Sequence, residues 1–290
     1  MEYHQDRFDD FSLMIFKSTK LVAILPANRE DNVLYSHQGL TYGDLILDKG
    51  LKLFDVASIL KSILLFLEND GIEKLIVKKI PSIYCKTPSD ELEYLFFILK
   101  ANLIRVDTLS VLKLDHLIKF SKDRLAGIKR GTKNGLCVLE ENKFDAFWNH
   151  ILIPNLKEKF KVNPTHSLDE IQYLKLKFPD KIRLFNVYNE EKLVAGTVIF
   201  ETDLVAHSQY ISSLENRNEI GSIDYLHEHL ITKVFQSKKY FDFGISNEES
   251  GRKINQGLQY WKEGFGARTI VQNFYELDVV NFKLLNSIWK

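Results

Sequence analysis

The same order of predicted elements occurs twice along the chain. Lys20–Ala23 and Lys192–Ala195 share the sequence Lys-Leu-Val-Ala, and each opens an apolar run typical of a strand. After each start, the spacing of apolar residues predicts a second strand that completes a hairpin, then a helix, a strand, a helix and a closing strand. Four identical residues can match by chance, but the shared order favours duplication. We therefore predict two related α/β domains, residues 1–115 and 116–290.

The hairpin of the first half should join strands at 20–26 and 33–37 through the polar turn 28–32. A helix from Leu53 to Leu67, a strand at 74–80, a helix capped by Thr87 and a strand at 103–106 follow. In the second half we expect strands at 192–201, 204–212, 240–245 and 269–277, with helices at 222–236 and 254–262. Two more helices, at 144–151 up to Pro154 and at 168–178, have no counterpart in the first half, so the N-terminal domain should be truncated.

Composition limits the classes of partner. The 39 basic and 39 acidic residues give a formal net charge of zero, which makes nucleic acid an unlikely partner. The longest apolar run is far below the ~20 residues of a membrane span, and no secretory leader is recognisable, so we expect a cytoplasmic protein. Residues 116–135 are locally basic and contain three glycines, which fits either a solvated linker or a rim that attracts an anionic ligand.

Residues 36–43, Ser-His-Gln-Gly-Leu-Thr-Tyr-Gly, combine polar side chains, two glycines and an aromatic residue. This composition favours a binding loop over a plain turn. We assign His37 and Tyr42 to substrate binding.

Two motifs carry a resemblance to a known family. Tyr-Phe-Asp-Phe-Gly at 240–244 and Tyr-Trp-Lys-Glu-Gly-Phe-Gly-Ala at 260–267 resemble motifs of the FemAB-like branch of the GNAT acyltransferases. That branch has two GNAT domains in tandem, each a mixed, mostly antiparallel sheet flanked by helices. The resemblance implies a thioester donor, acetyl-CoA or another acyl-CoA, and no metal. It also implies that a Gly-x-Thr-Tyr-Gly stretch like that at 39–43 faces an acceptor cleft between the domains.

The resemblance places the donor pyrophosphate on backbone amides that begin the helix after the central strand, where a helix presents free N–H groups and a positive dipole end. Here that segment is 216–222. Gly221 permits close approach, Ser222 caps, and Arg217 adds a cation. The residues assigned to the donor are Arg217, Asn218, Ile220, Gly221 and Ser222. An ordinary capped helix is the alternative.

Acyl transfer to an amine needs a base for the amine proton and an acid for the leaving thiolate. We assign these roles to His207, Asp242 and Tyr260, with Asp242 the preferred base, and we assign Lys262 to an acidic group of the acceptor. Each residue also has a structural alternative. His207 can pack on its strand, Asp242 can cap a turn, Tyr260 can pack beside Trp261, and Lys262 can bind carbonyls at the helix end.

Three functions are compatible with these residues and motifs. The first is N-acyl transfer to a small or sugar-linked amine, for instance in cell-surface polysaccharide synthesis. The second is the aminoacyl-tRNA-dependent extension of peptidoglycan precursors that the resemblance to Fem proteins implies. The third is a GNAT-like binding protein without turnover. The acceptor and the oligomeric state stay open.

Overall fold

The computed structural model describes residues 6–215 and 217–289. The chain divides into two compact units. Unit 1 contains the residues up to Asp107 together with Glu249–Arg252 and the residues from Val271 on, and unit 2 contains Thr108–Glu248 and Lys253–Ile270. In the described part of the chain, no helix is long and apolar enough to cross a membrane.

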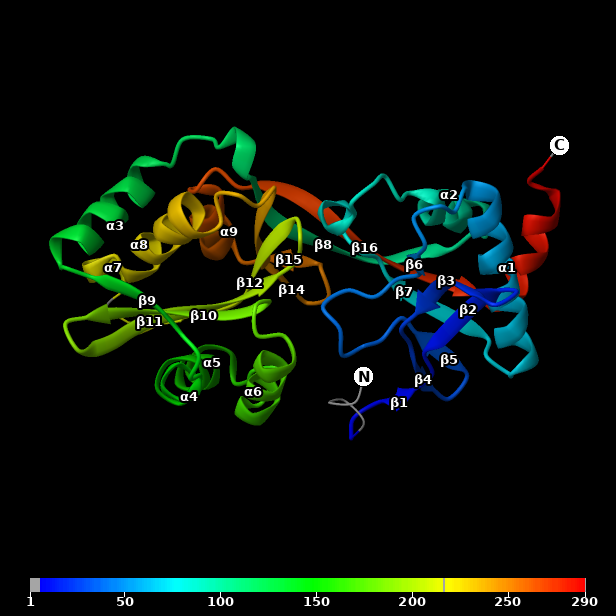
Figure 1. The fold of residues 1–290 in the computed structure, drawn as a ribbon, viewed down its shortest axis with the longest axis horizontal. Helices are drawn as coiled ribbons and strands as arrows, with labels where there is room; N and C mark the ends of the chain where they lie inside the picture. Colours follow the sequence, from blue (N-terminus) through cyan, green and yellow to red (C-terminus); the bar gives the residue numbers. More distant parts are fainter. Residues whose placement is uncertain (1–5, 216, 290) are drawn as a thin grey trace. The chain divides into compact units, whose positions relative to one another are not determined.

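Unit 1 is built around two sheets and the helices that cover them (Figure 1). One sheet has the order β1 (Asp9–Asp10), β4 (Asn28–Glu30), β5 (Val33–Tyr35), β7 (Lys74–Lys78) and β16 (Arg268–Asp278). The other has the order β2 (Leu13–Lys17), β3 (Lys20–Leu25) and β6 (Ile46–Leu47). The helices are α1 (Leu53–Asn69), α2 (Glu91–Ile98) and the 3-10 segments η2 (Ser82–Tyr84) and η6 (Val279–Ser287).

Helix α1 supplies much of the core of unit 1. Its apolar residues recur at the spacing of one helix face, and Val56, Leu60, Ile63, Leu64 and Leu67 are all buried there. The helix ends where Gly71 adopts a positive φ of 78°. This is the helix that periodicity predicted.

The hairpin predicted between strands at 20–26 and 33–37 is wrong. Strand β3 pairs with β2 and β6, whereas β5 forms a hairpin with β4 and a parallel pair with β7. Pro26 explains the difference, because it has no N–H to donate and ends β3 before the predicted turn. The predicted cap at Thr87 is also misplaced: α2 begins at Glu91, with Glu91 and Glu93 at its positive dipole end.

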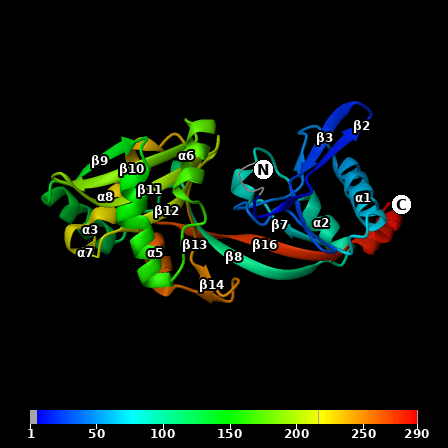
Figure 2. The same cartoon turned by 90° about the horizontal axis from the view of Figure 1, so that it is seen from below.

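In the described residues, unit 2 is a six-stranded sheet between two layers of helices (Figures 1 and 2). Its order is β8 (Asn102–Lys113), β13 (Tyr240–Ile245), β12 (Val205–Ser213), β11 (Lys192–Glu201), β10 (Ile182–Asn189) and β9 (Cys137–Glu141). One face carries α3 (Lys122–Lys133), α7 (Arg217–Ile220), α8 (Ser222–His229) with its π-helical extension η5 (Leu230–Val234), and α9 (Gln256–Glu263). The other carries α4 (Asp145–Phe147), the π-helix η4 (Trp148–Leu152), α5 (Ile153–Phe160) and α6 (Leu168–Lys177). The remaining short elements are η3 (Leu114–His116) and the pair β14 (Asn247–Glu248) and β15 (Lys253–Ile254).

Two long strands, β8 and β16, pass from one unit to the other along the chain. The strand that follows α2, β8, pairs antiparallel with β13 of unit 2, and the strand that follows α9, β16, pairs antiparallel with β7 of unit 1. Both strands therefore begin in one unit and end in the other. The predicted division at residue 115 differs from the observed one for this reason: it assigned residues 271–290 to the C-terminal domain, whereas they complete unit 1.

The basic stretch at 116–135 contains helix α3 from Lys122 to Lys133 and is therefore not a plain linker. Ser121 caps α3 by accepting a hydrogen bond from the Arg124 N–H. Two of its glycines face α8: a Cβ on Gly127 would meet the Asp224 carboxylate, and one on Gly131 would lie 2.5 Å from the Cβ of Tyr225. These glycines let the two helices approach closely. Pro154 does not end its helix, because it lies in the first turn of α5, where a missing N–H costs little.

Candidate active site

The parallel strands β12 and β13 separate after a short paired segment. They pair only from Val205 with Tyr240 to His207 with Asp242, while β12 continues to Ser213. Strand β13 changes direction at Gly244, which has a φ of 71°. The strands thus open at their carboxyl ends, and α8 begins beside the opening. Ligands of α/β sheets tend to bind at such carboxyl ends.

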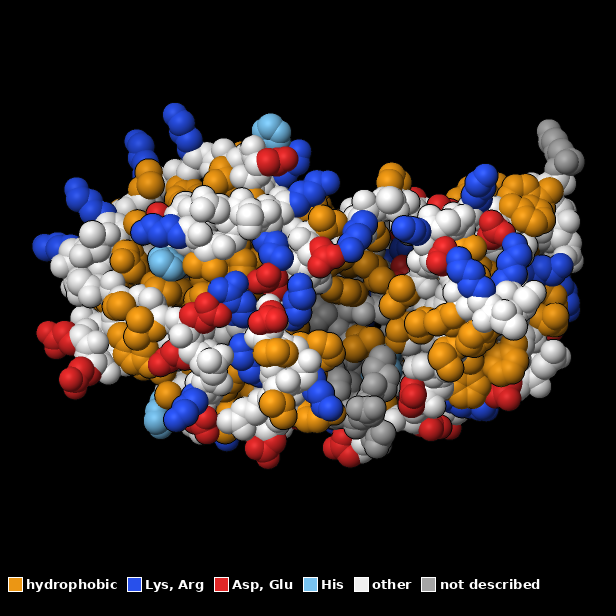
Figure 3. Space-filling model, in the orientation of Figure 1, with side chains coloured by type: hydrophobic (Ala, Val, Ile, Leu, Met, Phe, Trp, Pro, Cys, Tyr) orange, Lys and Arg blue, Asp and Glu red, His pale blue; other side chains and the backbone are white. Residues whose placement is uncertain are grey.

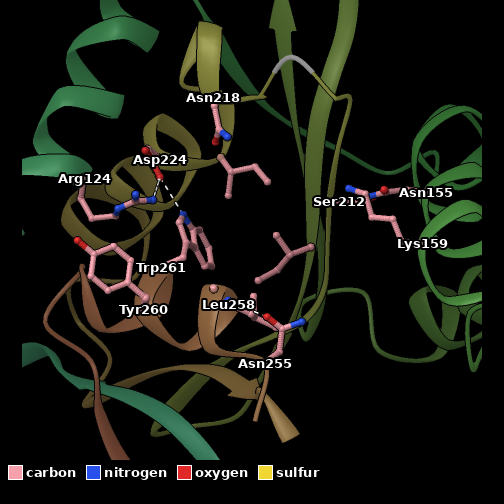
Figure 4. Close-up of a pocket in the computed structure, with 13 residues that line it drawn as sticks. Arg124, Asn155, Lys159, Ser212, Asn218, Asp224, Asn255, Leu258, Tyr260 and Trp261 are labelled. Carbon is pink, nitrogen blue, oxygen red and sulfur yellow. Dashed lines mark hydrogen bonds and ion pairs between the residues drawn. The ribbon is translucent and has the colours of Figure 1, made fainter. Parts of the chain in front are cut away.

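A pocket of about 460 Å³ lies beside the carboxyl end of β12 (Figure 4), and none of the described residues that line it belongs to β13. Ile211 and Ser212 of β12, residues of α7 and α8, the start of α9 and two residues of α5 line it. Its apolar lining is Ile211, Ile223, Leu258 and Trp261, and its polar lining includes Asn155, Lys159, Ser212, Asn218 and Asn255. Figure 4 shows Asn155 and Lys159 on the side opposite Asp224 and Trp261. The pocket therefore combines apolar surface with amide groups and a lysine.

Asp224 lies in the first turn of α8 and is held from two sides. Its Oδ1 accepts a hydrogen bond from Arg124 at 2.6 Å and one from the Trp261 indole at 2.8 Å. Burial raises the pKa of the Asp224 carboxyl, and the Trp261 hydrogen bond and the Arg124 charge oppose that rise. The positive end of α8 therefore already faces a carboxylate, and the charge of Arg124 is matched.

The donor residues predicted in the segment 216–222 lie around the start of α8. Asn218 lines the pocket, whereas Ile220, Gly221 and Ser222 are buried. A Cβ on Gly221 would meet the carbonyl oxygen of Gly127, so its close approach is to α3. Asn216 and the Arg217 side chain lie outside the described residues. A proline at Gly221, with φ fixed near −65°, is incompatible with the observed φ of 74°, so it cannot test donor binding in a folded protein.

His207 and Asp242 form a hydrogen-bonded pair at the last position where β12 and β13 are paired. The His207 Nδ1 lies 2.9 Å from Asp242 Oδ2, and Asp242 Oδ1 accepts from the Gly244 N–H at 2.7 Å. Asp242 is fully buried, and His207 is 8% exposed. A carboxylate on Nδ1 favours the tautomer with its proton on that nitrogen, which leaves Nε2 with a lone pair. The arrangement suits His207 as a base and Asp242 as the group that orients it.

Lys262 binds backbone carbonyls at the end of β13. It is 1% exposed, and its Nζ donates to the carbonyls of Gly244 at 3.0 Å and Ile245 at 2.6 Å. Burial lowers the pKa of Lys262 to about 8, and the Asp242 charge opposes the shift. This geometry favours a structural role for Lys262, because its ammonium group already donates to two backbone carbonyls and is buried away from solvent.

The lowered pKa of Lys262 predicts an unusual dependence of stability on pH. The unfolded chain binds more protons than the folded one between about pH 8 and the ordinary pKa of 10.5, so the free energy of unfolding should rise from pH 8 to pH 10. The slope should approach ~1.4 kcal/mol per pH unit for each such lysine. Lys78 of unit 1, whose pKa burial also lowers to about 8, contributes in the same direction.

Denaturant titrations at several pH values check this. Lys262→Met should flatten the slope for unit 2, whereas Lys192→Met, at an exposed position, should leave it unchanged. A Lys262→Met protein with the full original slope would contradict the assignment.

Tyr260 lies at the edge of the pocket but does not face the His207 and Asp242 pair. Its side chain is 58% exposed, and its hydroxyl donates to Asp123 Oδ2 at 2.7 Å. That hydrogen bond raises the pKa of Tyr260. The phenol is therefore engaged with α3, and its assignment as the acid stays a prediction that this geometry does not favour.

The corresponding opening in unit 1 is closed by the chain itself. Strands β5 and β7 are parallel like β12 and β13, but the loop after β5 hydrogen-bonds across the gap. The Ser36 hydroxyl donates to the Gly43 carbonyl at 3.0 Å and accepts from the Lys78 N–H, while the Gly43 N–H donates to the Lys78 carbonyl. A Cβ on Gly43 would meet the Ser36 carbonyl. Unit 1 therefore has its own loop where unit 2 has a pocket.

His37 and Tyr42 belong to this loop of unit 1. His37 is buried, its Nδ1 accepts from the Gly39 N–H at 3.2 Å, and its ring contacts Phe8. Tyr42 packs against Tyr84 with ring centroids 4.5 Å apart and the ring planes tilted by 42°. The structure does not group them with His207, Asp242 or Lys262 within one unit, and their role in acceptor binding stays a prediction.

Several pocket residues were not predicted from the sequence. Arg124, Asn155, Lys159, Asp224 and Asn255 lie on four helices or their caps and converge only through tertiary packing. Their local patterns are those of ordinary helix surfaces and caps. Trp261 belongs to the motif at 260–267, but no pattern in the sequence indicates its hydrogen bond to Asp224.

Comparisons with known proteins identify the fold. FemX has a TM-score of 0.69 at 9% identity, covering 99% of this chain and 92% of its own. L-PGS from Bacillus licheniformis has a TM-score of 0.59 at 13% identity, covering 92% and 86%. A tandem GNAT protein from the clavulanic acid biosynthesis pathway has a TM-score of 0.51 at 10% identity, covering 92% and 82%. No protein-family model and no curated protein sequence matches the chain.

At these identities the likeness shows the fold: a FemAB-like pair of GNAT domains. It confirms the fold class expected from the motifs at 240–244 and 260–267. Among the described residues, no three His, Cys, Asp or Glu side chains lie together as a metal site would require.

Proposed function

We propose that the chain is an N-acyltransferase that takes an acyl group from acyl-CoA and transfers it to an amine of a small or sugar-linked acceptor. One observation carries the proposal. The His207 and Asp242 pair lies where the pairing of β12 with β13 ends, and a pocket of about 460 Å³ follows further along β12, at Ile211 and Ser212. Neither His207 nor Asp242 lines that pocket. The GNAT-like fold of unit 2 supports the same reaction class.

The pocket has the chemistry to hold an extended thioester donor. Among the described residues, the register of β12 with β13 ends at His207, and β12 continues along the pocket to Ser213, so the extended arm of a pantetheine can lie beside this strand. Ile211, Ile223 and Leu258 offer apolar contact to the methylene groups of that arm. Lys159 and the pocket asparagines suit phosphate oxygens. A coenzyme A donor places the activity in the cytoplasm.

In the proposed reaction, His207 Nε2 accepts the proton of the attacking amine. The new bond joins the amine nitrogen to the acyl carbon, the carbon–sulfur bond breaks, and the proton returns from Nε2 to the thiolate sulfur. Asp242 stabilises the imidazolium formed in between and keeps the ring in position. This corrects the preference for Asp242 as the base: both of its oxygens are occupied and it is fully buried.

A second donor class is favoured by Asp224. Its carboxylate at the start of α8 is paired with Arg124, so this end of the pocket offers little net attraction to a pyrophosphate. An aminoacyl ester has no pyrophosphate next to its reacting end, so it does not depend on an anion site at the start of α8. The aminoacyl-tRNA-dependent alternative is therefore tested beside coenzyme A.

Calorimetric titration with coenzyme A tests the donor, and a variant that fills the pocket tests the site. Gly257 lines the pocket, and a Cβ there would have only the Asn255 Oδ1, at 3.8 Å, as a neighbour. Gly257→Trp should therefore fold normally and abolish binding. Leu176→Trp, at a position 77% exposed on α6, is the matched control and should bind like the original protein.

Each outcome separates the alternatives. Binding of coenzyme A that Gly257→Trp leaves intact would contradict the pocket as the donor site. No binding of coenzyme A, with protection by aminoacyl-tRNA, would transfer the proposal to the second donor class. Thermal stabilisation by neither donor would favour the binding protein without turnover.

A further inference from the structure

Helix α3 has two chemically different faces. Arg124, Gly127 and Gly131 pack towards α8. Residues 122, 125, 129 and 133 follow the spacing of one exposed stripe on the opposite face, and Arg130 is exposed at the border of that stripe, where its charge still acts on Asp224. We call these side chains the α3 surface: Lys122, Leu125, Lys129, Arg130 and Lys133, with Ile118 and Lys119 of the preceding segment.

The α3 surface is strongly cationic although the whole chain is neutral. It has five Lys and Arg side chains, and none of them is in a salt bridge with another described residue. Asp123 is the sole acid between residues 116 and 139, and it accepts a hydrogen bond from Tyr260. Figure 3 shows Lys and Arg side chains projecting from the molecule over α3. Such a patch attracts an anionic surface.

Apolar side chains lie among these cations. Leu125 is 53% exposed in the first turn of α3, and Ile118 is 44% exposed in the segment that precedes the helix. A phosphate backbone offers these two side chains no apolar contact. A bilayer offers both kinds of contact, because it presents anionic headgroups above an apolar interior.

We propose that the α3 surface docks the protein on a membrane that contains anionic lipids. The cations bind the headgroups, and Leu125 and Ile118 enter the interface between headgroups and acyl chains. Arg124, on the inner face of the same helix, lines the pocket, so docking holds the pocket about one helix diameter, ~10 Å, from the lipid surface. This surface does not depend on the proposed acyl transfer.

Co-sedimentation with vesicles tests the proposal. The protein should bind vesicles of phosphatidylcholine mixed with phosphatidylglycerol, and binding to phosphatidylcholine alone should be much weaker. Replacing Lys129, Arg130 and Lys133 together by Gln should weaken binding about 100-fold, because each cation near the surface contributes about fivefold. The matched control replaces Lys157, Lys192 and Lys233 by Gln, which removes the same charge elsewhere on unit 2 and should change binding little.

Leu125→Gln separates insertion from charge attraction. It keeps every cation and should still weaken vesicle binding several-fold, with an unchanged melting temperature. Absence of binding to anionic vesicles would overturn the proposal. Equal losses in the two triple variants would do so as well. The same conclusion would follow if the protein bound an RNA or DNA duplex through this surface but not vesicles.

Discussion

The His207→Ala protein should fold like the original and lose roughly 10²–10⁴-fold in kcat, the range expected for removal of a positioned general base. The expectation rests on the place of His207, at the apex of the opening between β12 and β13 and 2.9 Å from Asp242. Its side chain is packed in part, but replacing it removes no backbone hydrogen bond. The rate can be followed as thiol release from acetyl-CoA with a panel of amino sugars and small amines.

Asp242→Asn should also lower kcat, with a different signature. Asparagine keeps the size of the side chain but can donate to Nδ1, which favours the wrong imidazole tautomer. Added imidazole should then rescue His207→Ala in part and leave Asp242→Asn unrescued. His150→Ala, at an exposed histidine of η4, is the matched control and should retain full activity. If a folded His207→Ala protein turns over at the original rate, the proposed mechanism fails.

Periodicity predicted individual elements well because local contacts decide them. Helix α1 and strands β11 and β13 lie where the sequence placed them. Sheet pairing was predicted poorly. Whether β8 joins β7 or β13 depends on contacts between segments far apart in sequence, and both choices satisfy the same local pattern. Pro26 was the one local signal that could have corrected the first hairpin.

The candidate site shows the same limit. His207 and Asp242 were each chosen from their strands, but their contact follows from the register of a parallel pair joined through α8 and η5. Lys262 was predicted to bind an acidic group of the acceptor, because the sequence does not indicate that its side chain is buried. The pocket asparagines have no local signal, since an asparagine at a helix cap such as Asn255 is common for capping alone.

Gly221→Ala should destabilise unit 2 by roughly 2–5 kcal/mol. Gly221 has a φ of 74°, a conformation that costs a residue with a Cβ roughly 1–2 kcal/mol. The added methyl would also meet the carbonyl oxygen of Gly127 and lie 2.9 Å from the Gly131 nitrogen, and both are backbone atoms. Since neither can rotate away, α3 must shift from α8, and overpacking of this kind costs roughly 1–3 kcal/mol.

Gly135→Ala is the matched control for this prediction. Gly135 follows α3 in the same unit and has a φ of 66°, but a Cβ there would meet nothing within 4 Å. The control therefore carries the conformational cost alone, and the difference between the two variants measures the contact between α3 and α8. Urea titrations of both proteins give that difference. Equal losses of stability in the two variants would mean that α3 and α8 can move apart at no cost in free energy. The close packing of these helices at Gly221 would then not be what holds Arg124 against Asp224.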